Sequence, residues 1–120
     1  MWNKYCVSVY SNHDNNFDNI EQYLKLASKY ECDEIFTSAH VPESKLEEQF
    51  KFIEELSYIV HKHKMELTVD FGGISLYSLI ESKSNYASMV IDNIRLDCGY
   101  DELLNANLFT NNLFKLIKIN

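Results

Sequence analysis

The chain switches repeatedly between two hydrophobic periodicities. Apolar and polar residues that alternate one by one are typical of β-strands, and apolar residues three or four positions apart are typical of α-helices. The alternating segments predict five strands, at residues 5–10, 34–38, 66–71, 93–97 and 116–120. The helical spacing predicts helices around residues 17–27 and 46–60, a weaker helix within 74–89 and a helical turn over 101–107.

The second predicted helix carries a signal at each end. Ser44 and Glu47 have the spacing of a capping box, in which each side chain bonds a backbone N–H of the first turn. The basic run at residues 61–64 suits the negative end of the helix dipole. We therefore expect this helix to begin at Ser44.

The order of the predicted elements indicates the fold class. Strict alternation of strands and helices implies parallel strands joined by right-handed crossovers, which is an α/β fold of (β/α) units. A closed eight-stranded barrel takes about 250 residues. The 120 residues therefore predict a partial TIM barrel of about five strands and four helices, as a single domain over residues 1–120.

Most of the predicted strands have one apolar and one polar face. In the strand at 66–71, Leu67 and Val69 share one face, and Thr68 and Asp70 share the other. The strand at 34–38 is less clear, because Phe36 lies with the polar residues. The apolar face is suited to pack under helices. The polar face either lines a barrel, whose catalytic groups lie at the C-terminal strand ends, or is simply wetted by solvent.

Composition and charge exclude several classes of function. The net charge is −7, and acidic residues outnumber lysine and arginine and are spread over the helix-like segments, which argues against a nucleic-acid partner. No apolar run approaches the roughly 20 residues that span a membrane, and no signal-peptide pattern opens the chain, so we expect a cytoplasmic protein without a membrane partner.

The potential metal ligands of the chain lack the spacing of a metal site. The three cysteines, Cys6, Cys32 and Cys98, are far apart, and we expect them to be reduced thiols. His61 and His63 are two positions apart on a helix and do not share a face. We therefore expect these two histidines to be surface residues and predict no metal.

Several segments resemble one bacterial family, the 6-phospho-N-acetylmuramidases, once known as outer surface protein-like proteins. The most specific is Ile-Phe-Thr-Ser-Ala-His-Val-Pro-Glu at 35–43. The others are Val-Ser-Val-Tyr at 7–10, Met-Glu-Leu-Thr-Val-Asp at 65–70, Ile-Arg-Leu-Asp-Cys-Gly-Tyr at 94–100, and Thr-Asn-Asn at 110–112 before Ile-Lys-Ile-Asn at 117–120. Together they are similar to the N-terminal barrel domain of that family.

The resemblance implies a fold and an activity. The family has a (β/α) barrel followed by a cyclophilin-like domain. It hydrolyses N-acetylmuramic acid 6-phosphate from N-acetylglucosamine in the cytoplasm, during recycling of cell-wall sugars, with no metal or organic cofactor. The partner expected for this chain is thus a phosphorylated amino-sugar disaccharide.

The chain also departs from the family pattern. The second half of the barrel and the cyclophilin-like domain have no counterpart here. Phe71–Gly73 replaces a Ser-Pro-like turn, Leu113 replaces a proline, and Lys118 stands where an acidic or neutral polar residue is typical. We therefore expect a truncated product, a fragment or a degenerate relative that is inactive alone, and leave open whether the chain is an enzyme.

Two carboxylates are the predicted catalytic residues. Glycoside hydrolysis generally uses two carboxyl groups roughly 5–10 Å apart. Asp70 and Asp97 end neighbouring predicted strands, and such strands are about 4.8 Å apart. The alternatives are that Asp70 caps the following turn and that Asp97 forms a salt bridge with Arg95.

Four further residues are predicted to bind the substrate. Arg95 shares the polar face and is suited to an anion, and Tyr10 is suited to a sugar ring. His40 lies in the loop after the second strand, and Asn120 ends the fifth. Solvation of His40 and packing of Tyr10 at the barrel rim are the alternatives.

A function without catalysis is the competing hypothesis. Unpaired strand edges are templates for association. The chain would then be a βα module that forms a homodimer or pairs with a separate half through its open edges, or a vestigial product.

Overall fold

The chain forms alternating strands and helices, as the periodicity predicted. This computed structural model describes residues 5–11, 16–39, 41 and 44–96. The strands are β1 (Tyr5–Ser8), β2 (Cys32–Ser38), β3 (Glu66–Phe71) and β4 (Asn93–Leu96). The helices are α1 (Phe17–Lys29), α2 (Leu46–Lys62), α3 (Gly73–Glu81) and a short 3₁₀ helix, η1 (Lys83–Tyr86).

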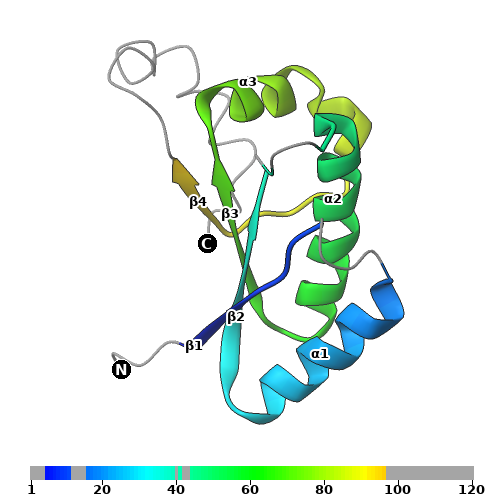
Figure 1. Cartoon of the computed structure of the whole chain (residues 1–120), viewed down its shortest axis with the longest axis vertical. Coiled ribbons are helices and arrows are strands. Elements are labelled where there is room, and N and C mark those ends of the chain that lie inside the picture. Colours follow the sequence, from blue (N-terminus) through cyan, green and yellow to red (C-terminus); the bar gives the residue numbers. More distant parts are fainter. Residues whose placement is uncertain (1–4, 12–15, 40, 42–43, 97–120) are drawn as a thin grey trace.

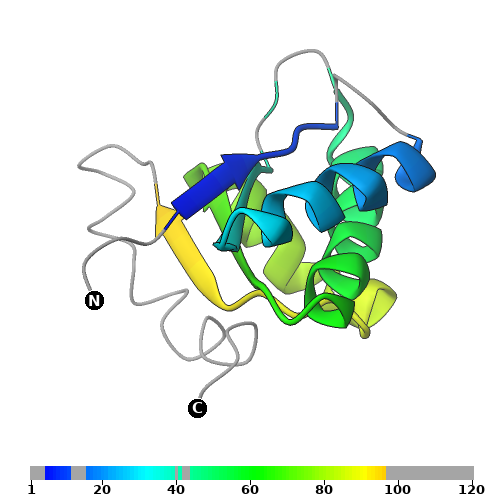
Figure 2. The ribbon, with the colours of Figure 1, turned by 90° about the horizontal axis from the view of Figure 1, so that it is seen from below.

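The described strands form one parallel sheet in the order β1-β2-β3-β4 (Figure 1). Neighbours in the sheet are thus neighbours in sequence, as in a (β/α) barrel. The helices cover one face of the sheet (Figure 2). The α/β class of parallel (β/α) units is therefore confirmed. The predicted turn at 101–107 and the fifth strand at 116–120 lie outside the described residues.

The core lies between the helices and the sheet. Leu67, Val69 and Phe71 of β3 point toward the helices and are fully buried, as are Leu24 of α1 and Ile53 of α2. Every second residue of β3, beginning at Glu66, is half-exposed on the other face. The predicted division into an apolar helix-covered face and a polar face is confirmed for this strand.

The predicted capping box at the start of α2 is wrong. The N-cap is Lys45, which makes no side-chain cap bond. The preceding loop is held by Gln49, which is 2% exposed. Its side-chain oxygen accepts from the Val41 N–H at 3.1 Å, and its amide donates to the carbonyl oxygens of Val41 at 3.1 Å and Ser44 at 3.0 Å. Ser44 thus belongs to the loop, and the helix begins at Leu46.

Helices α1 and α2 are joined by an aromatic contact and an ion-pair cluster. The rings of Phe17 and Phe52 lie 5.5 Å apart. The carboxylate of Glu21 lies 2.8 Å from both Lys62 Nζ and His63 Nε2. Hydrogen bonds from Lys62 and His63 lower the pKa of Glu21 to about 2. This cluster fixes the end of α2 against α1.

Candidate active site at the C-terminal ends of the strands

Three polar residues lie in one row across the sheet. The parallel register pairs Ser38 of β2 with Asp70 of β3, and Asp70 with Arg95 of β4. These positions are at the C-terminal ends of their strands, on the face opposite to the helices. This is the end at which active sites of (β/α) barrels lie. Asp70, a predicted catalytic residue, therefore lies outside the helix-covered core.

Asp70 and Arg95 differ in their exposure. Asp70 is half-buried, and its Oδ1 atom is shielded from solvent. Arg95 is exposed. Adjacent strands are separated by about 4.8 Å and paired residues share a face, so Asp70 and Arg95 are neighbours on the open face of the sheet. The row combines a sheltered carboxylate with an accessible cation, which is an arrangement suited to an anionic sugar.

An aromatic pair borders this row. The Tyr10 and Phe36 rings meet edge to face, with centroids 6.4 Å apart. Phe36 is paired in register with Thr68, two residues before Asp70. Tyr10, a predicted substrate-binding residue, thus lies beside the same face as Asp70. Phe36 was not predicted as a site residue, although it interrupts the apolar alternation of its strand.

Three other predicted site residues, His40, Asp97 and Asn120, lie outside the described residues. The separation of the two predicted catalytic carboxylates, Asp70 and Asp97, therefore stays a prediction. The roles assigned to Tyr10, Asp70 and Arg95 also stay predictions, since the geometry places them but does not test their chemistry.

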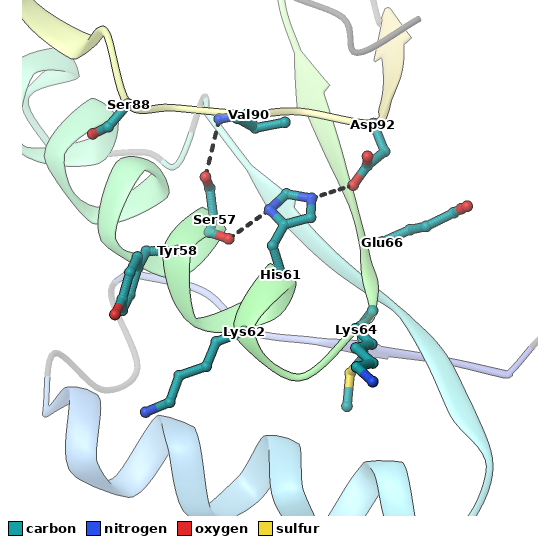
Figure 3. A pocket seen from close by; sticks show the side chains of 10 residues that line it. Ser57, Tyr58, His61, Lys62, Lys64, Glu66, Ser88, Val90 and Asp92 are labelled. Carbon is teal, nitrogen blue, oxygen red and sulfur yellow. Dashed lines mark hydrogen bonds and ion pairs between the residues drawn. The ribbon is translucent and has the colours of Figure 1, made fainter. Parts of the chain in front are cut away.

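A pocket lies at the other end of β3, near Glu66 (Figure 3). Its volume is about 850 Å³, and the end of α2 and the segment before β4 line it. In it, His61 Nε2 lies 2.6 Å from Asp92 Oδ2, and His61 Nδ1 lies 2.7 Å from the carbonyl oxygen of Ser57. The Ser57 hydroxyl accepts from the Val90 N–H at 3.0 Å.

This Ser, His and Asp arrangement is structural. A catalytic triad needs the serine hydroxyl on the imidazole nitrogen that the carboxylate leaves open. Here that nitrogen, His61 Nδ1, contacts the backbone carbonyl oxygen of Ser57 and not its hydroxyl. Asp92 Oδ2 also accepts from the Leu67 N–H at 2.8 Å, so it joins the segment before β4 to β3. His61 and His63, predicted to be surface residues, have side chains that are 26% and 19% exposed, and each contacts a carboxylate, that of Asp92 and that of Glu21 respectively.

The described residues contain neither a cluster of potential metal ligands nor a membrane-spanning helix. No group of three or more His, Cys, Asp or Glu side chains in this part of the chain is placed to hold a metal ion. Among the same residues, no helix is long and apolar enough to cross a membrane.

Comparison with known proteins identifies a family and a related structure. A crystal structure of a conserved protein from a locus in Enterococcus faecalis, with an unknown function, has a TM-score of 0.60 and 23% sequence identity to this chain. The match covers 87% of this chain and 29% of that protein, so the chain spans less than a third of its length and shares its fold. A comparison with curated proteins finds no match. The model of the family "6-phospho-N-acetylmuramidase, N-terminal" matches residues 5–120, and the chain belongs to this family.

Proposed function

We propose that this chain forms the N-terminal part of the substrate pocket of a glycosidase. The substrate is a disaccharide in which N-acetylmuramic acid 6-phosphate is linked to N-acetylglucosamine, and the reaction serves cytoplasmic recycling of cell-wall sugars. One observation carries the proposal. Asp70 lies on the open face, at the C-terminal end of its strand and in register with Arg95, in a chain of the muramidase family.

The proposed chemistry needs two carboxyl groups and a site for the anion. Asp70 is one carboxyl group, and Asp97, which follows β4 directly, is the proposed second. Arg95 binds the phosphate or the carboxylate of the sugar, because a guanidinium bonds such groups with two parallel N–H donors. Tyr10, His40 and Asn120 are the proposed contacts to the sugar rings.

We further propose that the 120-residue chain turns over little substrate by itself. Hydrolases exclude bulk water from the reacting groups, whereas Arg95 at the proposed pocket is exposed. Incubation of the chain with the phosphorylated disaccharide, followed by chromatography of the sugars, tests this. Turnover comparable with that of full-length relatives contradicts the proposed inactivity.

Binding tests the proposed pocket without turnover. Calorimetric titration of the disaccharide into the chain should give an affinity that Asp70→Asn changes at least about fivefold, as expected for loss of a charged hydrogen bond. Asp33→Asn is the matched control, because Asp33 is exposed at the opposite end of β2. Equal affinities of the two variants argue against the proposed pocket.

A second candidate function is self-association without catalysis. Tyr23 and Leu26 of α1 and Tyr30, the C-cap residue of this helix, are three and four positions apart and are 44%, 53% and 75% exposed. Large apolar groups at this spacing form a stripe suited to a protein interface. Light scattering after size exclusion tests the expected homodimer, and Leu26→Glu should dissociate it. A monomeric wild-type chain at all concentrations rules this function out.

A further inference from the structure

Two threonines on neighbouring strands have hydroxyl groups without a hydrogen-bond partner. Within the part of the chain that the structure describes, neither Thr37 Oγ1 of β2 nor Thr68 Oγ1 of β3 is bonded, and both atoms are shielded from solvent. Thr37 points into the helix-covered core and is 0% exposed. Thr68 is half-exposed on the opposite face. An unbonded buried hydroxyl is uncommon in folded proteins, so each needs an explanation.

The surroundings of Thr68 differ from those of Thr37. Its register partners are Phe36 on one side and Asn93 on the other, and Asp70 lies two residues along on the same face. Phe36 is packed edge to face against Tyr10. Thr68 thus lies between an aromatic pair and a set of polar side chains. Ligand sites commonly combine apolar walls with a few placed polar groups.

This combination suits a pyranose ring. One face of such a sugar presents C–H groups, which pack on an aromatic surface, and its rim presents hydroxyls, which need hydrogen-bond partners. The half-exposed Thr68 side chain can exchange its methyl and hydroxyl positions by one rotamer step about χ1. That step turns the hydroxyl toward a bound ligand.

We propose that Thr68, with the Phe36 and Tyr10 rings, forms a subsite for the neutral part of a sugar ring. The inference rests on the proposed function, because it extends the row of Ser38, Asp70 and Arg95 toward the strand N-termini by two positions, to the next residue of β3 on the same face. It assigns binding to residues that carry no charge. Arg95 binds the anionic group of the substrate and Asp70 takes part in the reaction, whereas this subsite binds the sugar ring.

The pair of threonines provides the test. The probe is N-acetylglucosamine, which has no phosphate and no carboxylate, titrated into the 120-residue chain by calorimetry. Thr68→Val should weaken binding about tenfold, as expected for loss of one hydrogen bond. Its melting temperature without sugar should be equal to or above that of the wild type, because valine removes an unbonded hydroxyl. Thr37→Val should change the melting temperature in the same direction and leave the affinity unchanged.

One further variant completes the test. Thr68→Ser keeps the hydroxyl and should bind the probe within about twofold of the wild type, as expected when the hydrogen bond is kept. The subsite is overturned if the wild type does not bind the probe, if both valine variants lose affinity equally, or if Thr68→Val lowers the melting temperature. Failure of the proposed glycosidase would instead appear as equal binding of the phosphorylated disaccharide by Asp70→Asn and Asp33→Asn, while the neutral probe still binds.

Discussion

Asp70 and Arg95 occupy directly paired positions on β3 and β4, although 25 positions separate them in the chain. The pairing brings a sheltered carboxylate and an exposed guanidinium to the same end of the sheet. We predict that Arg95→Gln weakens binding of the phosphorylated disaccharide about tenfold or more, since a charged hydrogen bond is lost. Calorimetry in low and high salt measures this.

The control for Arg95 is a cation elsewhere on the surface. Lys29 at the end of α1 is exposed and distant along the chain, so Lys29→Gln should leave the affinity unchanged. Arg95→Lys should recover only part of the affinity, because an ammonium group does not reproduce the planar fork of a guanidinium. An equal loss in Lys29→Gln would indicate a general charge effect and contradict the role of Arg95.

The cluster of Glu21, Lys62 and His63 predicts a dependence of stability on acid pH. The pKa of Glu21 is lowered from 4.5 to about 2 in the folded chain by hydrogen bonds from Lys62 and His63. The depressed pKa means that its stabilising contribution is complete above about pH 4.5 and is lost as the pH falls toward 2. Glu21→Gln should therefore flatten the fall in the free energy of unfolding across this window.

Urea unfolding at a series of pH values measures this slope. Because the cluster is on the surface, the difference should be small and should shrink with added salt. Glu48→Gln, an exposed position on α2, is the control. A Glu21→Gln variant as sensitive to acid as the wild type would show that the cluster does not stabilise the fold.

Gln49 should be important for stability despite being polar. It is 2% exposed and makes three hydrogen bonds to the loop that contains Val41 and Ser44. Gln49→Leu removes all three bonds and leaves the buried Val41 N–H without this acceptor, although the Val41 carbonyl keeps a bond from the Ser44 N–H at 3.4 Å. We expect it to lower the free energy of unfolding by about 2–3 kcal/mol. Denaturant titration measures this. Gln22→Leu, at an exposed position on α1, should change it by less than about 0.5 kcal/mol.

Asp92 should affect stability but not sugar binding. Its Oδ2 atom accepts from His61 Nε2 and from the Leu67 N–H, at the end of β3 away from Asp70. Asp92→Ala should cost about 2 kcal/mol through these two lost bonds. Affinity for the phosphorylated disaccharide should remain that of the wild type at a temperature where the variant is folded. Ser57→Ala should likewise retain that affinity, and its loss in either variant would give the pocket near Glu66 a functional role.

The residues of the proposed site were predictable to different degrees. The alternation in the strands places Asp70 and Arg95 on the polar face, and the structure agrees. Phe36 and Thr68 were missed as site residues, because an aromatic ring and a threonine at strand positions are equally compatible with packing. The prediction of a capping box at Ser44 was wrong for a similar reason. Gln49, the residue that holds this loop, lies within the helix, and its hydrogen bonds depend on how the loop folds back onto it.

The sequence by itself determined the alternation of strands and helices and the division of β3 into an apolar and a polar face. Both follow from periodicity, which is a property of residues close together in the chain. Only the tertiary structure decided that Asp70 is paired with Arg95 and that His61 reaches Asp92, 31 positions away. Strand register and long-range hydrogen bonds arise from the packing of separate elements, and no local pattern specifies them.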